Sequence, residues 1–266
     1  MTLFDRVLDR IGQLIAERLE RPLSGYEPYT PSDPDTLRRV LKPADVVLIE
    51  GNQKVSSAIK YLTQSTWSHA ALYIGDALGS DAGEPCMLIE ANLGYGVVAV
   101  PLSKYASFNT RICRAVGLTD EDMRRVVAFA TTHLGDKYDT RNIVDLARYL
   151  LPTPPVPVRW RRRMLALGSG EPTRVICSTL IAQAFQSIRY PILPRVERLP
   201  GEERAESAYS RREIHHIRHH SLFVPRDFDL SPYFRVVKPT IEAGFNHRGL
   251  KWAGGEMKAA AAGAPL

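Results

Sequence analysis

The stretch STWSHAALYIG, residues 65–75, carries the clearest pattern from which the fold of this chain can be predicted. From position 69 onward its side chains alternate between two sides of an extended backbone, with His69 and Tyr73 on one side and Leu72 on the other. A period of two over small and apolar residues predicts a β-strand at 69–75. The strand therefore begins with a histidine, a side chain that can serve as a base in catalysis.

Other short segments on either side of this strand predict a mixed fold. Four further runs are typical of strands, and they cover Val46–Glu50, Cys86–Ala91, Val97–Val100 and Arg111–Val116. Helices are predicted at Val55–Leu62, Thr119–Leu134, Thr140–Leu150 and Cys177–Ile188, and the second of these starts with a capping box of Thr119 and Asp122. The expected class is α+β, with a small antiparallel β-sheet or barrel and helices packed around it.

Cys177 stands in the first turn of the last of these helices. A helix N-terminus presents unpaired N–H groups and a positive dipole end, which favour a thiolate and can bind an oxyanion. A cysteine nucleophile also needs a base and a group that orients the base. His69 and Glu90, on neighbouring predicted strands, supply both, and Asn92 is a weaker alternative to Glu90.

Each of the three residues also has an ordinary structural explanation. The alternatives are a core cysteine, a capping histidine and a salt-bridged glutamate, because a buried carboxylate needs a partner. Signatures of other chemistries are missing from the sequence, including Gly-x-Ser-x-Gly, His-Glu-x-x-His, a phosphate-binding loop with lysine, and Cys-x-x-Cys. No cofactor and no metal ion are expected.

Composition limits the classes of protein that remain. The chain has 266 residues, a net charge of +6 and three cysteines, which suits one large or two small domains with free thiols. A transmembrane bundle is excluded because no run of about 18 apolar residues occurs. No secretory signal is expected, since charged residues interrupt the apolar ones at the start. The predicted location is the cytoplasm of a bacterium, with contact to the inner face of the membrane as an extension of that prediction.

Three segments together resemble the circularly permuted papain-like cysteine hydrolases, in the YiiX/YebB branch of the NlpC-type superfamily, which is related to lecithin retinol acyltransferase-like proteins. They are KPADVVL at 42–48, STWSHAALYIG at 65–75 and VICSTLI at 175–181, supported by the segments LIEA at 88–91 and GDKYD at 135–139. In ordinary papain-like enzymes the cysteine precedes the histidine, whereas here His69 precedes Cys177. The resemblance implies a nucleophile at Cys177, a base at His69 and an orienting Glu90.

One position departs from the family pattern. The first motif of the family usually has Gly-Asp, whereas this chain has Ala44-Asp45. We expect Asp45 to be structural, so the departure is expected to have little effect on catalysis.

The resemblance implies a cysteine-dependent hydrolase or acyltransferase that works through an acyl-thioester. Its substrate would be an acyl-amide, a peptide or a lipid, and a peptidoglycan or peptide amidase is one alternative. A second alternative is a papain-like module that binds a partner without catalysis. All three triad residues are present, which favours the enzyme.

The predicted organisation has three parts. Residues 1–33 form an amphipathic helix and a linker, 34–240 the catalytic domain with insertions or lid-like segments at 151–171 and 189–222, and 241–266 a tail. The helix is expected to dock on the protein's own core or on a second copy, giving a homodimer, with a membrane surface as the weaker alternative.

Positive charge is concentrated in one part of the chain. Between Leu151 and His220 there are twelve arginines, no lysine, six glutamates and no aspartate. Such a segment can meet an anionic lipid surface, but no nucleic-acid partner is expected because no binding signature accompanies it. Four histidines, His215, His216, His219 and His220, would pair at i, i+4 on a helix, and we expect a solvated surface there rather than a metal site.

Overall fold

A computed structural model describes residues 27–29, 33–79, 84–92, 96–136, 176–198 and 213–249. The expected helices at the N-terminus and at 140–150 lie outside these residues. So do residues 159–167, a basic part of the arginine-rich stretch, and residues 250–266 of the expected tail. Among the described residues no helix is long and apolar enough to cross a membrane.

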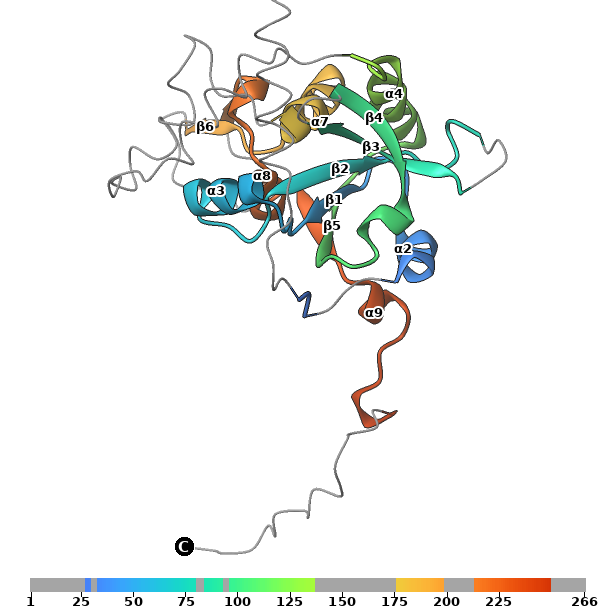
Figure 1. Cartoon of the computed structure of the whole chain (residues 1–266). Coiled ribbons are helices and arrows are strands. Elements are labelled where there is room, and N and C mark those ends of the chain that lie inside the picture. Colours follow the sequence, from blue (N-terminus) through green and yellow to red (C-terminus); the bar gives the residue numbers. More distant parts are fainter. Residues whose placement is uncertain are drawn as a thin grey trace, which may run out of the picture.

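Six antiparallel strands form the central sheet, in the order β4-β3-β2-β1-β5-β8 (Figure 1). The strands are β1 (Val46–Ile49), β2 (His69–Tyr73), β3 (Cys86–Asn92), β4 (Gly96–Pro101), β5 (Thr110–Ala115) and β8 (Phe234–Val237). The first five match the predicted strands to within two residues at each end, and the α+β class is confirmed. Strand β8 was not predicted, and it pairs with β5 at one edge of the sheet. In the described pairings β4 and β8 are the two edges, so the sheet is open rather than a closed barrel.

Helices cover both faces of this sheet. The helices are α2 (Pro34–Val40), α3 (Lys54–Thr63), α4 (Asp120–Thr132), α7 (Ile176–Ser187), α8 (Pro225–Leu230) and α9 (Pro239–Glu242). Three 3-10 turns accompany them: η1 (Leu102–Tyr105), η2 (His220–Leu222) and η3 (His247–Gly249). Helices α4 and α7 pack on one face in a core around Phe185, whereas α2 and η1 pack on the other around Leu37 and Tyr105.

Local sequence explains where two of the helices begin. The side chain of Thr119 accepts a hydrogen bond from the backbone N–H of Asp122, and Asp122 accepts one from the backbone N–H of Thr119, which confirms the predicted capping box of α4. Helix α2 begins at Pro34 after Asp33, whose carboxylate accepts from the backbone N–H of Thr36 at 2.9 Å. Helix α2 was not predicted, because its only signal in the sequence is the capping Asp33 followed by Pro34.

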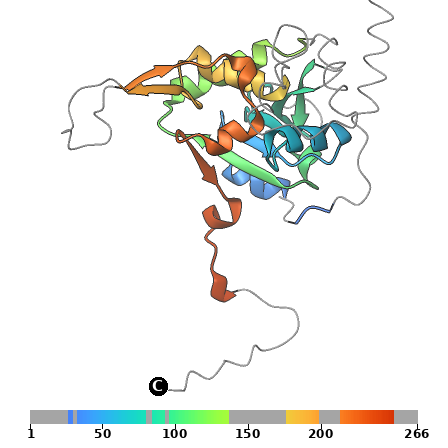
Figure 2. The same ribbon diagram turned by 90° about the vertical axis from the view of Figure 1, so that its left-hand side faces the viewer.

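A second, two-stranded sheet lies apart from the first. Strands β6 (Arg195–Arg198) and β7 (Glu213–His216) pair antiparallel, and the hairpin projects to one side of the molecule (Figure 2). His215 and His216 therefore lie on a strand and His220 in a 3-10 turn, so the four histidines do not share one helix. The helix that would have brought the i, i+4 histidine pairs together is therefore not formed, and the described residues contain no group of three or more potential metal ligands.

Candidate active site

His69 is the first residue of β2, and its neighbours in the chain hold the strand start in place. The backbone N–H of Ser68 donates to the carbonyl of Ile49 on β1 at 3.2 Å, and its hydroxyl accepts from the N–H of Gly51 at 3.0 Å. An added Cβ at Gly51 would come within 2.8 Å of that hydroxyl, so the close approach requires glycine.

Trp67 anchors the same segment from the other direction. Its indole N–H donates to Asp229 of α8 at 3.2 Å, and the guanidinium of Arg111 lies 4.9 Å from the ring centre. Arg111 also pairs with Asp229 at 2.8 Å. The residues before His69 are therefore held by β1, β5 and α8, which limits the movement of the histidine backbone.

Glu90 is the acidic partner of His69. The Nε2 atom of His69 lies 3.1 Å from Oε2 of Glu90. The antiparallel register of β2 and β3 pairs Leu72 with Ile89 and, continued to the start of β2, sets His69 diagonal to Glu90. Diagonal neighbours on one face of a sheet are within reach of long side chains, which explains the contact.

The Glu90 carboxylate is completely buried and accepts from four side chains. Oε2 accepts from His69 and from the Tyr105 hydroxyl, and Oε1 accepts from Lys104 and, at 2.6 Å, from the amide of Asn92. Asn92 therefore contacts the glutamate rather than replacing it. Burial alone would raise the pKa of Glu90, but His69 and Lys104 outweigh it and hold that pKa well below its usual value.

Cys177 is the second residue of α7 and is almost completely buried. Helix α7 packs against β2 and β3, the strands that carry His69 and Glu90. Burial lowers the pKa of His69, but the charge of Cys177, a hydrogen bond with its side chain and the contact with Glu90 outweigh burial and raise the pKa to about 10. The structure thus brings together the three residues that the sequence singled out.

Because Glu90 occupies Nε2, the ring nitrogen left for Cys177 is Nδ1. A histidine with a carboxylate on one nitrogen and a thiol on the other can hold a proton between a nucleophile and a leaving group. The side chain of His69 keeps 20% of its surface exposed, so the site is open to a reacting group.

Lys104 and Tyr105 were missed by the sequence analysis. Both lie in η1, directly after β4, and β4 is the hairpin partner of the strand that carries Glu90. The signal was present in the sequence, because a hairpin returns the chain to the glutamate and the two polar residues follow immediately. Their side-chain direction, however, depends on the turn and could not be read from spacing.

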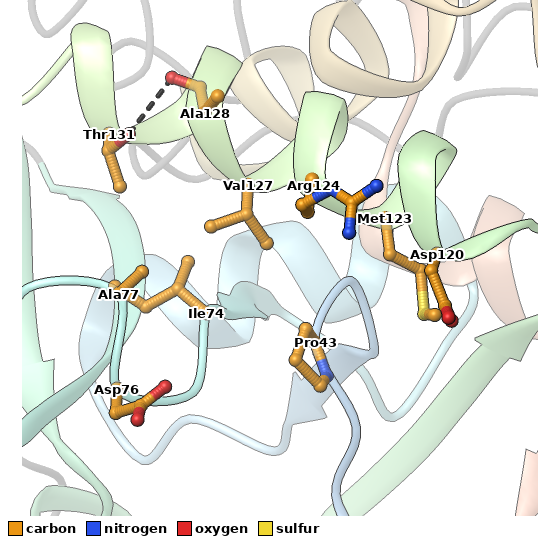
Figure 3. Close-up of a pocket in the computed structure, with 10 residues that line it drawn as sticks. All are labelled: Pro43, Ile74, Asp76, Ala77, Asp120, Met123, Arg124, Val127, Ala128 and Thr131. Atoms are coloured by element: carbon orange, nitrogen blue, oxygen red, sulfur yellow. Dashed lines mark hydrogen bonds between the residues drawn. The ribbon is translucent and has the colours of Figure 1, made fainter.

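A separate cavity of about 540 Å³ lies elsewhere, between α4 and the turn that follows β2 (Figure 3). The apolar side chains of Pro43, Ile74 and Val127 line it, with the carboxylates of Asp76 and Asp120 nearby. Ile74 follows the end of β2 whereas His69 starts the strand, a separation of about 16 Å at 3.3 Å per residue. This cavity is therefore not part of the His69 site.

The antiparallel sheet with its packed helices is consistent with a permuted papain-like fold. Residues 40–149 match the family model of permuted papain-like amidases of the YaeF/YiiX type, the C92 peptidase family. The match confirms the permuted papain-like resemblance and indicates a hydrolase of the amidase kind. The matched range contains His69 and Glu90 and ends before Cys177. The wider relation to NlpC-type enzymes and to lecithin retinol acyltransferase-like proteins stays a prediction.

Among solved structures, this chain is similar to one described as metalloprotein YiiX from Escherichia coli O157:H7. The two chains are 16% identical, with a TM-score of 0.44, over 74% of this chain and 96% of that one. No curated protein shows a significant match to this chain.

Proposed function

We propose that the chain is a cysteine-dependent amide hydrolase that uses Cys177 as nucleophile, His69 as acid and base, and Glu90 to orient His69. The observation that carries this proposal is the position of His69 between the thiol of Cys177 and a buried, ionised carboxylate. An amide is the proposed substrate class because the matched family is described as one of amidases.

In the first half of the reaction the thiolate of Cys177 attacks the acyl carbon of the amide. The oxyanion that forms is stabilised by N–H groups at the start of α7. The carbon–nitrogen bond then breaks, and the departing amine takes the proton from His69, leaving a thioester on Cys177.

Water completes the reaction in the second half. Neutral His69 removes a proton from water, which attacks the thioester carbon and releases the carboxylic acid. The sulfur leaves as thiolate beside the protonated histidine, which restores the starting pair. An acyl acceptor other than water would make the same protein a transferase. The acyl-lipid alternative depends on the basic segment at 159–167, which lies outside the described residues.

The test is thiol labelling followed by mass measurement. Limiting iodoacetamide is applied from pH 5 to 9 to the unaltered chain and to His69→Ala, and Cys113 serves as the internal control. Cys113 is buried in the core, and burial raises its pKa well above the usual value. We expect Cys177 to react selectively well below pH 8, and His69→Ala to lose that selectivity.

The same preparations are then assayed on a panel of N-acyl amides and short peptides, with Cys177→Ala as the matched variant. We expect hydrolysis by the unaltered chain and none by Cys177→Ala. Turnover that persists in Cys177→Ala overturns the proposal. Cysteines that all react alike, with ordinary thiol pH dependence, would favour the non-catalytic binding module.

A further inference from the structure

The Glu90 carboxylate has one partner that moves a proton in the proposed reaction and three that do not. Its two oxygens accept from His69, Asn92, Lys104 and Tyr105, which matches the roughly four acceptor sites of a carboxylate. Within this group His69 and Lys104 carry positive charge. The charge on His69 is present only while its ring holds both protons.

This creates an electrostatic problem during turnover. When His69 gives its proton to the leaving amine, a buried Glu90 paired with His69 alone would become an uncompensated buried charge. The carboxyl group would then tend to take up a proton, and it would no longer accept a strong hydrogen bond from Nε2 of His69. Lys104 supplies a positive charge on Oε1 that does not change through the cycle, and it lowers the pKa of Glu90.

Tyr105 has a different effect on the same group. Its hydroxyl donates to Oε2, the oxygen that also faces His69. Burial, followed by the charge of Glu90, raises the pKa of Tyr105 well above its usual value, so the phenol keeps its proton. A permanent donor at Oε2 holds that oxygen against Nε2, and the Tyr105 ring lies 6.1 Å from the imidazole centre.

Both residues lie on a turn that is itself fixed. Leu102 and Tyr105 are buried in the core around Leu37, and η1 packs against α2. The backbone N–H and hydroxyl of Ser103 both donate to Glu84, in the segment before β3. The Lys104 side chain keeps 40% of its surface exposed but still ends on Oε1 of Glu90.

We propose that Lys104 and Tyr105 are positioning residues that keep Glu90 ionised and directed at His69 Nε2 while His69 changes its protonation state. This inference rests on the proposed function, and it assigns separate effects to the two residues. Lys104 sets the pH range in which the glutamate is charged, and Tyr105 fixes which oxygen meets the histidine.

The experiment measures Cys177 labelling and amide hydrolysis against pH in Lys104→Met, Lys104→Arg and Tyr105→Phe. In Lys104→Met the acid limb of both profiles should move up by as much as about one pH unit, because the cluster loses a cation that favours its anionic groups, Glu90 and Cys177. The value of kcat should fall about tenfold or more, with little change in KM. Lys104→Arg, which keeps the positive charge, should restore both the position of the acid limb and the value of kcat. Tyr105→Phe should lower kcat about tenfold and move the acid limb less than Lys104→Met does, since a neutral donor is lost rather than a charge.

Two matched controls separate this effect from general damage. Arg124→Met removes one positive charge from an exposed pair with Glu121, and Tyr61→Phe removes a phenol hydroxyl at an exposed position of α3. Both should keep the unaltered profiles. Lys104→Met and Tyr105→Phe profiles that superimpose on those of the unaltered chain overturn this inference alone. Loss of selective Cys177 labelling in the unaltered chain overturns the proposed function instead.

Discussion

Nε2 of His69 lies 3.1 Å from Oε2 of Glu90, across two neighbouring strands of one antiparallel sheet. This single contact sets the orientation of the imidazole ring and leaves Nδ1 for Cys177. It also joins a partly exposed histidine to a carboxylate with no exposed surface. The contact lets the cluster be tested by changing one partner at a time.

The protonation state of His69 should depend on Cys177. The charge and hydrogen bond of Cys177 raise the pKa of His69 to about 10, so Cys177→Ser, which puts an uncharged hydroxyl there, should lower it. Imidazole signals in ¹H–¹⁵N NMR spectra, followed from pH 5 to 11, measure this directly. An identical His69 titration in both chains contradicts the assignment of Cys177 as its partner.

Glu90 and Asn92 should differ sharply in their importance for activity. Glu90→Gln removes the charge that faces Nε2, and we expect kcat/KM to fall by about 100-fold or more. The Asn92 amide donates to Oε1 of Glu90, whereas His69 faces Oε2, so Asn92→Ala should cost less than about tenfold. Steady-state kinetics on one amide compares the two. Equal losses would show that the amide of Asn92 has a direct part in orienting His69.

Substitution of Asp45 should lower the free energy of unfolding and leave the reactivity of Cys177 unchanged. Its buried carboxylate accepts from two nitrogens of Arg114, at 2.8 and 2.6 Å, and from the N–H of Lys42. Asp45→Ala leaves Arg114 with the Val40 carbonyl but without a carboxylate, and loss of one member of a buried ion pair costs about 3–5 kcal/mol. Urea denaturation measures this cost. Adding Arg114→Leu should recover part of it.

Labelling of Cys177 tests whether the Asp45 substitution also disturbs the candidate active site. This residue precedes the end of β1 that faces Leu72, whereas His69 pairs with Ile49 at the opposite end. Folded Asp45→Ala should therefore keep selective labelling of Cys177. A variant of normal stability that loses the selectivity would place Asp45 in the catalytic machinery.

Ala44 lies in the left-handed region, with φ of 69°, at the position where the family pattern has glycine. That conformation costs an L-residue roughly 1–2 kcal/mol, which glycine avoids. Glycine also loses about 0.4–1 kcal/mol through the entropy of the unfolded chain, and a buried methyl contributes about 0.8 kcal/mol. The opposing effects nearly cancel, which explains why this chain tolerates alanine.

Two substitutions test this balance by chemical denaturation. Ala44→Gly should change the free energy of unfolding by less than about 1 kcal/mol. Ala44→Val should destabilise by more than about 2 kcal/mol, because a β-branched side chain is strained at this φ and the site is buried. Equal stability of all three chains would mean that the backbone relaxes at this turn.

Five strands and three of the helices were predicted with nearly correct ends because their signals are local. Alternation with a period of two marks 69–75, and a capping box marks the start of α4. Strand β8 was missed because its four residues show no alternation of exposure, with both ends buried and the middle exposed. Its identity as a strand depends on pairing with β5, which lies more than 100 positions earlier in the chain.

In the candidate site, too, some features have local sequence signals and others depend on contacts between distant segments. The residue types, their order, and the placement of His69 at a strand start and Cys177 at a helix start could all be predicted from the sequence. That Glu90 rather than Asn92 contacts His69, and that Lys104 and Tyr105 contact the glutamate, became visible only in the folded structure. The reason is physical: strand and helix signals come from near neighbours, whereas burial and the charges that shift a pKa come from segments that folding brings together.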